Sequence, residues 1–387
     1  MINPTLALIP SAYKASKVYS ILPSNGDGDF TFTRASFATR VNSNGLIESV
    51  GVNLPRLDYS DGNCPSLLLE PQRTNLVTYS EDFSQWSSLD NTLNLIDGIS
   101  PDGGSLVYEL TSVSSGKLQL TISNLSINTE YTFSFYVKKT TSGNLSAQSR
   151  IASLTGGSGG SNLTVVNYQD ELVTNEWVRI THTFTTDDTL GNYVVYVSNF
   201  LTISKSLQFY GAQLEQGSYA TSYIPTNGNI ATRITETCTD SGNVNTFNDS
   251  EGVLFVEASA LVSGSNAQIT LSDGTNDNII ILRFDLNIIR LSFFIRGNGG
   301  AYAVDFITGV TQTNNNKIAL VYDDINLRIW LNGAELGSVT VSDLPIGLNS
   351  LNLSGATGSD RFIGKVKQLQ YFNTALTDLE LQELTTL

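Results

Sequence analysis

The stretch YTFSFYVKK, residues 131–139, alternates large apolar side chains with smaller or polar ones. Tyr131, Phe133, Phe135 and Val137 would share one face of an extended strand, because successive side chains of a strand point to opposite sides. Similar runs recur at 176–186, 192–200, 205–215 and 317–333. Residues typical of turns separate them, a rhythm found in β-sandwiches and jelly rolls. The sequence therefore predicts an all-β fold.

The spacing of these runs divides the chain into parts. Residues 1–75 are irregular, with several Pro and Gly residues, and hold too few regular strands for a core of their own. We expect residues 1–75 to be an attachment and oligomerisation region that is ordered only against another surface. Residues 76–228 and 251–387 are each long enough for one β-sandwich, and 229–250 connect them.

A single helix is predicted near the end of the chain. The segment TALTDLELQEL, residues 374–384, offers Thr374 or Thr377 as the N-cap, and acidic residues fall in the first turn. Its leucines recur at helical spacing. We therefore expect one short terminal helix in an otherwise β-structured chain.

The composition describes an acidic chain with few charged residues. Charged residues make up 15% of the 387 residues, against about 25% in ordinary globular proteins, and the formal net charge is −15. Because an acidic chain repels phosphate backbones, we expect no nucleic-acid partner. No apolar run approaches the roughly 20 residues of a membrane helix, and the start lacks the pattern of a secretory signal. We expect synthesis in a cytoplasm and no membrane partner.

Metal and thiol chemistry are not indicated. Cys64 and Cys238 lie far apart and in no metal-binding spacing, so each is expected to be a buried free thiol. The segment NGDGDFTF, residues 25–32, starts like a calcium loop, but Phe30 stands where glycine is expected and no glutamate closes the loop. We interpret it, and SDGTNDN at 272–278, as turns. No metal or cofactor is predicted.

Catalytic groups are equally sparse. The single histidine, His182, lies on a threonine-rich strand, with no nucleophile or orienting acid near it in sequence. No strand carries the alternating acids that a retaining glycosidase uses. Asp323 and Asp324 fit a hairpin turn, and Glu380 and Glu383 fit the exposed face of the terminal helix. The sequence predicts a protein that is not an enzyme.

Aromatic side chains are the remaining candidates for ligand binding. In the segment LRIWLNG, Trp330 shares a strand face with Arg328 and Asn332, so that one ring is flanked by hydrogen-bonding groups. Such a face suits a sugar, which stacks on an aromatic ring and hydrogen-bonds through its hydroxyls. We predict a glycan platform of Trp330, Arg328 and Asn332. The alternative is that Trp330 packs in the core, as tryptophan side chains usually do.

Several segments resemble parts of known protein families. FTFTRASFATRVNSNGLIESVGVNLPRLDY (30–59) and CPSLLLEPQRTNLVTYSEDFSQW (64–86) resemble a segment of the structural proteins of tailed bacteriophages. FYGAQLEQGSYATSYIPT (209–226) resembles the closing strand of the carbohydrate-binding-module-like sandwich that follows it there. Residues 251–387 resemble a concanavalin A/laminin G-type module. Together these similarities cover nearly the whole chain.

The resemblance implies a virion protein. It implies a head fibre, tail fibre or related appendage, including those of crAss-like phages, and supplies no catalytic residues. The expected partners are copies of the same chain, with a homotrimer favoured, other virion proteins and a host surface glycan. In this interpretation Tyr219 and Tyr223 dock their segment on a neighbouring domain or subunit. Two alternatives stay open: a polysaccharide depolymerase or glucanase on the virion, and a bacterial surface adhesin.

Overall fold

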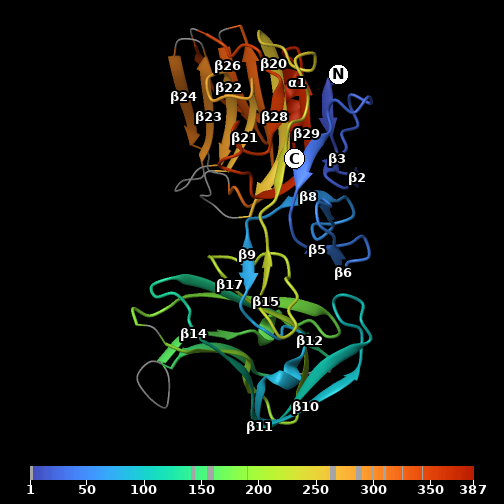
Figure 1. Cartoon of the computed structure of the whole chain (residues 1–387), viewed down its shortest axis with the longest axis vertical. Coiled ribbons are helices and arrows are strands. Elements are labelled where there is room, and N and C mark those ends of the chain that lie inside the picture. The colour runs from blue at the N-terminus through green and yellow to red at the C-terminus, as the bar shows by residue number, and fades with distance from the viewer. Residues whose placement is uncertain are drawn as a thin grey trace. The chain divides into compact units, whose positions relative to one another are not determined.

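A computed structural model describes residues 3–140, 144–154, 161–189, 191–261, 267–284, 290–297, 300–307, 311–324, 326–341 and 343–387. The chain divides into two compact units (Figure 1). We call Leu46–Ser49 with Gln72–Arg233 the central unit, and Met1–Gly45, Val50–Pro71 and Ile234–Leu387 the terminal unit. Both consist mainly of antiparallel strands, so the predicted all-β fold is confirmed.

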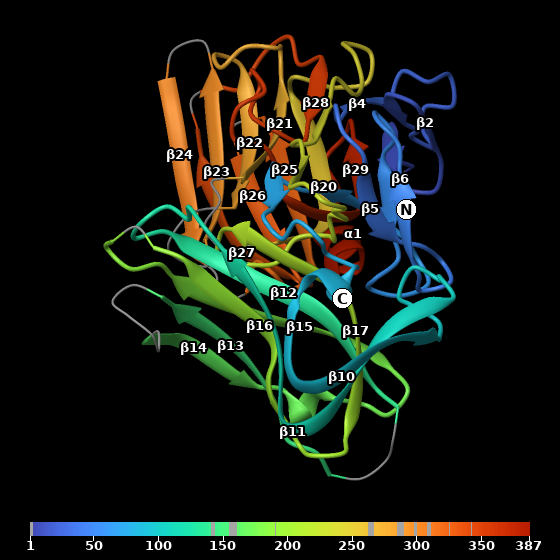
Figure 2. The same ribbon diagram turned by 60° about the horizontal axis from the view of Figure 1, so that its bottom comes forward.

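The central unit is a jelly-roll-like sandwich. Its strands are β10 (Ser87–Asp97), β11 (Leu106–Ile122), β12 (Glu130–Lys139), β13 (Ala147–Ser153), β14 (Ser161–Asn167), β15 (Trp177–Thr185), β16 (Tyr193–Leu201) and β17 (Ser206–Gln216). They pair in the order β14-β13-β16-β11-β17-β12-β15, and β10 also pairs with β11 (Figure 2). The long strand β11 pairs with β17 through residues 108–111 and with β16 through residues 118–122, so it takes part in both layers.

The core of the central unit follows the predicted alternation. Phe133, Phe135 and Val137 of β12 are fully buried, and they pack in one apolar cluster with side chains such as Phe209 of β17 and Val195 of β16. Two short strands, β9 (Arg73–Asn75) and β18 (Ala231–Arg233), pair with each other at the ends of this unit's main segment. Two single-turn helices, η1 (Phe83–Gln85) and η2 (Gln169–Glu171), also belong to this unit, as do the first three residues of β6 (Ile47–Val50).

Among the described residues, three sheets of four or more strands lie in the terminal unit. The first is β27 (Ala334–Thr340), β26 (Asn326–Leu331), β25 (Asn316–Asp323), β20 (Glu251–Ala260), β29 (Gly364–Phe372), β8 (Ser66–Leu69) and β7 (Arg56–Asp58), with β1 (Leu6–Leu8) also paired to β29. The second is β24 (Gly300–Ile307), β23 (Arg290–Gly297), β22 (Ile279–Phe284), β21 (Ala267–Ser272) and β28 (Ser350–Asn352). The third is β19 (Thr237–Thr239), β4 (Phe30–Thr33), β3 (Lys17–Val18) and β2 (Tyr13–Lys14); β5 (Ala38–Val41) lies nearby in sequence.

The N-terminal residues do not form the separate region that we expected. Leu6 and Leu8 of β1, Phe30 and Phe32 of β4, and Leu67 of β8 belong to the same buried cluster as the strands after residue 250. Each short strand is completed by a partner far away in the sequence: β1 pairs with β29, and β4 with β19. The predicted division at residues 75, 228 and 250 therefore differs from the structure, in which 1–45 and 50–71 share a core with 234–387.

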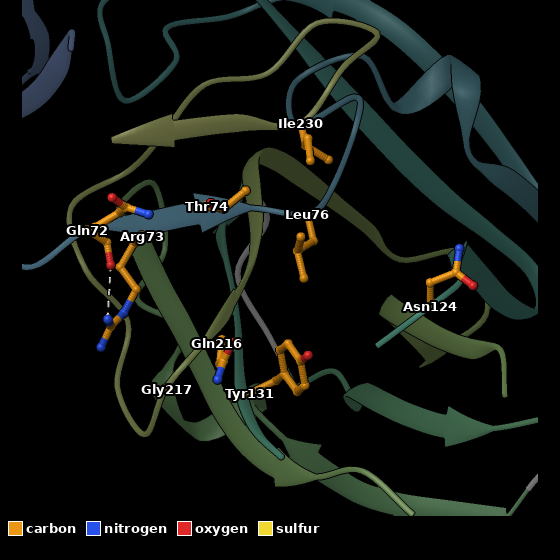
Figure 3. A pocket seen from close by; sticks show the side chains of 9 residues that line it. All are labelled: Gln72, Arg73, Thr74, Leu76, Asn124, Tyr131, Gln216, Gly217 and Ile230. Atoms are coloured by element: carbon orange, nitrogen blue, oxygen red, sulfur yellow. Dashed lines mark hydrogen bonds between the residues drawn. The ribbon is translucent and has the colours of Figure 1, made fainter. Parts of the chain in front are cut away.

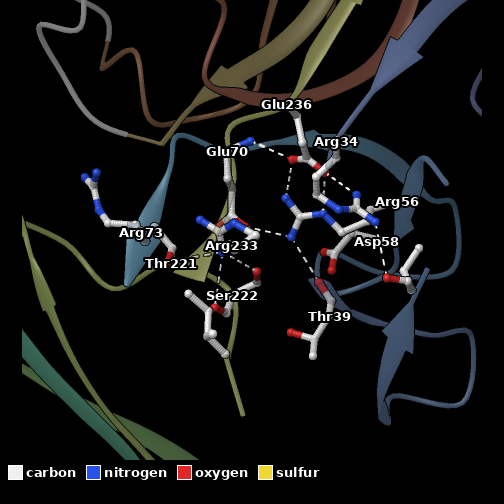
Figure 4. A network of polar contacts seen from close by, with 12 residues as sticks. Arg34, Thr39, Arg56, Asp58, Glu70, Arg73, Thr221, Ser222, Arg233 and Glu236 are labelled. Atoms are coloured by element: carbon white, nitrogen blue, oxygen red, sulfur yellow. Dashed lines mark hydrogen bonds and ion pairs between the residues drawn. The ribbon is translucent and has the colours of Figure 1, made fainter. Parts of the chain in front are cut away.

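Four buried charged side chains join distant segments of the terminal unit (Figure 4). Arg56 donates from Nη1 to Glu70 (2.7 Å to Oε2) and from Nε to Glu236 (2.9 Å to Oε1), and Arg34 donates from Nη1 to the same Glu236 oxygen at 2.6 Å. All four side chains are at most 3% exposed. We call Arg34, Arg56, Glu70 and Glu236 the buried charge network. Three of its members lie in segments 30–59 and 64–86, so these segments take part in the core of the terminal unit.

The remaining part of segment 64–86 belongs to the central unit, where the side chain of Asn75 fixes it by hydrogen bonds. The buried Asn75 amide donates to the carbonyls of Ala212 and Ile224, at 3.1 and 2.8 Å, and its oxygen accepts from the backbone of Val77 and Leu214. The segment around residue 75 is thereby hydrogen-bonded to both ends of the 211–226 run.

The two tyrosines of the 211–226 run contact residues of their own unit. Tyr223 is 2% exposed; its hydroxyl donates to Glu81 (2.9 Å to Oε1), and its ring packs beside Tyr136 and Tyr210. The ring of Tyr219 lies 5.3 Å from the Arg73 guanidinium of the same unit. The expectation of an external anchor is wrong for Tyr223, because strands of its own unit already bury that side chain.

The predicted helix and hairpin are confirmed. Helix α1 (Asp378–Thr385) begins after Thr377, whose side chain caps the backbone amide of Glu380 while the Glu380 carboxylate returns a bond to Thr377. Asp323 ends β25 and Asp324 adopts a left-handed conformation in the turn before β26. No helix among the described residues is long and apolar enough to cross a membrane.

The two cysteines differ from each other. Cys238 is buried in β19, as expected, and burial raises the pKa of its thiol. Cys64 is exposed, because it lies in the turn before β8 rather than in a strand. The expectation of a buried thiol is therefore wrong for Cys64.

Candidate glycan-binding site

The predicted platform at Trp330 is not exposed. Trp330 is 7% exposed and packs with Phe255 of β20, Phe372 of β29 and Leu376 and Leu381 at helix α1. The helix covers the face of β25 and β26 that the strand pattern alone leaves open to solvent. The structure therefore corrects this prediction in favour of its alternative, a core position.

The two flanking residues of that platform have structural partners. Arg328 donates to Asp378 at the start of α1, with 2.5 Å between Nη1 and Oδ1. Asn332 adopts a left-handed conformation in the turn between β26 and β27, and its oxygen accepts from the backbone amide of Lys317 at 2.9 Å. Arg328 thus fastens α1 to β26, and Asn332 closes a turn.

His182 has a hydroxyl beside it but cannot act as a catalytic base. Its Nε2 lies 3.0 Å from Oγ of Ser149, and Ser149 donates to the carbonyl of Tyr196. Both side chains are buried, and Nδ1 of His182 has no hydrogen-bond partner among the described residues, so no acid orients the ring. Burial lowers the pKa of His182 to about 4. The pair joins the two layers of the central sandwich inside its core.

The acidic residues singled out from the sequence serve turns and caps. Asp323 and Glu383 are exposed, and Glu380 belongs to the helix cap. In the 25–32 segment, Asn25 donates its side-chain amide to Asp27 at 2.8 Å. Among the described residues, no cluster of three His, Cys, Asp or Glu side chains could hold a metal ion.

One outer face of the central unit carries groups suited to sugars. On β13, Ala147, Ser149 and Ile151 point into the core, so Gln148 and Arg150 point outward. The register places Gln148 opposite Asn167 of β14, and Arg150 opposite Tyr196 of β16. Tyr196 in turn lies opposite Gln119 of β11. We call Gln119, Gln148, Arg150, Asn167, Tyr196 and Asn199 the amide face.

Hydrogen bonds organise the amide face into a row. Gln148 donates to Asn167 (Nε2 to Oδ1, 3.0 Å) and accepts from Asn199 (Nδ2 to Oε1, 2.6 Å). Each amide has two N–H donors and an oxygen with two lone pairs. The two hydrogen bonds within the row use only some of them, so other donors and lone pairs can bind the hydroxyl of a ligand. Asn167 is exposed, and Gln148 and Asn199 are half-buried. The row is ordered before a ligand arrives, which lowers the entropic cost of binding.

Arg150 and Tyr196 form the second part of the amide face. The Arg150 guanidinium lies 5.3 Å from the Tyr196 ring centroid, and the ring is 8% exposed. The guanidinium of Arg150 therefore packs against the Tyr196 ring on this outer face. Val165 of β14, 39% exposed, lies opposite Arg150 and adds an apolar contact.

The terminal unit has a smaller polar hollow on its second sheet. Ile281 and Arg283 of β22 point outward, because Ile280, Leu282 and Phe284 lie in the core. With Gln268 and Asp360 they line a cavity of about 260 Å³.

The sequence contained a signal for the amide face that our prediction did not use. The alternation of Ala147, Ser149 and Ile151 with Gln148 and Arg150 marks one polar face of β13. The pairing with Asn199 and Tyr196 depends on the strand register, which the local sequence does not reveal.

Two parts of the chain match models of known domain families. Residues 80–199 match a carbohydrate binding domain, and residues 254–382 match the concanavalin A-like lectin/glucanases superfamily. No curated protein matches the chain. The first match contains β10 to β16, except for the last residues of β16, and so includes every residue of the amide face.

Several solved structures share a part of the fold at low similarity. The CBM40 domain of a Ruminococcus gnavus IT-sialidase, bound to α2,3-sialyllactose, is 18% identical, with 36% of this chain and 84% of that chain covered and a TM-score of 0.32. A xylan-binding domain from Paenibacillus barcinonensis is 10% identical, with 38% and 94% covered and a TM-score of 0.29. The enzymatically active domain of tailspike protein 4 of bacteriophage CBA120 is 14% identical, with 37% and 21% covered and a TM-score of 0.29.

Proposed function

We propose that this chain is a glycan-binding structural protein of a tailed bacteriophage virion, where it forms part of a head or tail appendage. The observation that carries glycan binding is the coincidence of two findings. Residues 80–199 match a carbohydrate binding domain, and the strands of that stretch present the amide face.

The chemistry of the amide face suits a neutral sugar. Sugar hydroxyls both donate and accept, and the side-chain amides of Gln148, Asn167 and Asn199 do the same. The apolar C–H face of a sugar ring can lie on the guanidinium plane of Arg150 and on Val165. Binding would therefore combine a few oriented hydrogen bonds with contact over a flat surface.

The virion role rests on the resemblance of segments 30–59 and 64–86 to phage structural proteins. Arg34, Arg56 and Glu70 of these segments build the buried charge network with Glu236, so the two segments belong to one core. We propose that the partners are copies of the same chain, as a homotrimer, together with other virion proteins and a host surface glycan. The protein would be made in the host cytoplasm and become part of the particle.

We further propose that the chain binds without cleaving. The support is local: Ser149 and His182 are inside the core, and the amide face itself carries no carboxylate. The two alternatives, a polysaccharide depolymerase or a bacterial adhesin, make different predictions about products and location.

Glycan binding is tested with the full chain on an array of bacterial surface glycans. Gln148→Ala removes the central member of the amide row, so array signals should fall at least about tenfold, since partner groups are left unpaired. Gln382→Ala, which removes the same side chain from the exposed face of α1, serves as a matched control and should leave the signals unchanged. Equal signals for both variants would contradict the proposed site.

The other parts of the proposal have separate tests. Incubating the protein with each bound glycan should release no new reducing ends; release would favour the depolymerase. Mass spectrometry of purified phage particles, followed by immunogold labelling, should find the chain on an appendage. Detection on the bacterial surface in cells without phage would instead favour the adhesin.

A further inference from the structure

A cavity in the central unit is lined by residues other than those of the amide face (Figure 3). It has a volume of about 650 Å³, within the usual range of roughly 300–1,000 Å³ for small-ligand pockets. An adjoining cavity of about 370 Å³ shares Leu76, Asn124 and Ile230 with it. We call the two together the β9 groove, because Arg73 and Thr74 of β9 form one side and Gln216 and Gly217, at the end of β17, form the other.

The β9 groove contains a positive charge held in place. Arg73 is the only charged side chain among the described residues that line the larger cavity. Its guanidinium lies 5.3 Å from the Tyr219 ring centroid, Nη1 donates to the carbonyl of Gln72 at 3.1 Å, and Nε lies 3.6 Å from Oε2 of buried Glu215. Nη2 has no hydrogen-bond partner among the described residues, so it keeps two donors for a ligand.

The backbone at Gly217 makes room for this guanidinium. A Cβ atom at Gly217 would come within 2.7 Å of Nη2 of Arg73, and the φ of +131° is itself unfavourable for residues with a side chain. Glycine is therefore needed for the approach of Arg73 to the end of β17. The position of the charge is a property of the fold rather than of a loose surface side chain.

The rest of the groove has the composition of a sugar site. Gln72, Asn124 and Gln216 are exposed side-chain amides on its rim. Leu76 and Ile230, the latter 55% exposed, form an apolar wall, as Figure 3 shows above the Tyr131 ring. Polar groups that converge around an apolar wall are the usual pattern of a small-ligand site.

We infer that the β9 groove binds a saccharide that carries a carboxylate, such as a uronic or sialic acid unit. A guanidinium recognises a carboxylate through parallel N–H donors, and it stands out in a chain whose net charge is −15. The inference shares its ligand class, sugars, with the proposed function but not its residues, so either can fail without the other. In this account the central unit distinguishes acidic from neutral glycans through two separate surfaces.

The test compares acidic probes with neutral ones by isothermal titration to the full chain. The pairs are tri-galacturonate against galactotriose, and 3′-sialyllactose against lactose, so the two sources of carboxylate are distinguished. We expect one of the two acidic probes to bind at least about tenfold more tightly than its neutral partner. Added salt should reduce this difference in affinity.

Three variants locate the binding site. Ile230→Asp puts a negative charge on the apolar wall and should weaken the acidic probe at least about tenfold. Ile203→Asp makes the same change at another exposed isoleucine of the central unit, 59% exposed and outside the groove, and should weaken it less than about twofold. Arg73→Lys keeps the charge beside Glu215 but removes the planar donors, and should weaken the probe severalfold.

Specific outcomes would overturn the inference. The inference is wrong if each acidic probe binds only as tightly as its neutral partner. It is also wrong if Ile230→Asp and Ile203→Asp weaken binding equally, or if Arg73→Lys leaves the affinity unchanged. Gln148→Ala changes only the amide face and should leave the acidic probe unaffected. Its effect on neutral glycans therefore tests the proposed function separately.

Discussion

Replacing Arg56 with methionine should strongly destabilise the terminal unit. The change keeps most of the side-chain volume but removes the bonds from Arg56 to Glu70, Glu236 and the carbonyl of Thr39. Burial alone would lower the pKa of Arg56, but Glu236 and Glu70 beside it hold it above its ordinary value, so the guanidinium stays charged throughout. Without it, the buried carboxylates of Glu70 and Glu236 lose a countercharge that both of them contact.

The expected cost is about 3–5 kcal/mol, the range for removing one partner from a buried ion pair. For a unit of this size, each kcal/mol lowers the melting temperature by roughly 2–4 °C, so the transition should shift by about 6–20 °C. Differential scanning calorimetry of the full chain measures this. A double variant, Arg56→Met with Glu70→Met, leaves Arg34 paired with Glu236 and should recover part of the loss.

Arg328→Met is the matched control for that experiment. It makes the same substitution in the same unit, but Arg328 pairs with Asp378, whose side chain is 70% exposed. An exposed pair contributes roughly 0–1 kcal/mol, so the shift should be small. Equal shifts for Arg56→Met and Arg328→Met would refute the idea that the buried charge network holds the N-terminal strands in the core.

Three further predictions concern the same cores. The pKa of His182 is about 4 in the folded chain and about 6.5 in the unfolded chain. Its contribution to the free energy of unfolding is therefore complete above pH 6.5, and about 3 kcal/mol is lost as the pH falls to 4. Denaturant titrations of the wild type should show this dependence on pH, and those of His182→Leu should not. Trp330→Ala should cost about 3–5 kcal/mol of unfolding free energy and leave glycan binding intact; lost binding at unchanged stability would restore the platform. Asn75→Ala should cost at least about 2 kcal/mol by the same titration, whereas exposed Asn144→Ala should change it by less than about 0.5 kcal/mol.

The sequence predicted those features that short-range patterns control. The alternation around Phe133 places that side chain in the core, and the cap at Thr377 begins the helix as expected. In both cases the signal lies within one strand or one turn. The all-β class followed from many such segments taken together.

Features that depend on distant pairing were not predictable in this way. Trp330 is buried because α1, some fifty residues later in the chain, packs on its strand. Leu6 is buried because β1 pairs with β29, and Arg56 because Glu236 arrives from a distant segment. None of these contacts leaves a periodic signal near the residue itself. The amide face was missed for the same reason, since its rows exist only across four strands.

The most direct test of glycan binding by the amide face is the affinity of the full chain for a neutral glycan identified on the array. Isothermal titration should compare the wild type with the double variant Gln148→Ala and Asn199→Ala. The account predicts an affinity at least about tenfold lower for the double variant, since the organised amide row is lost, with a melting temperature close to that of the wild type. An unchanged affinity in a folded double variant would contradict the account.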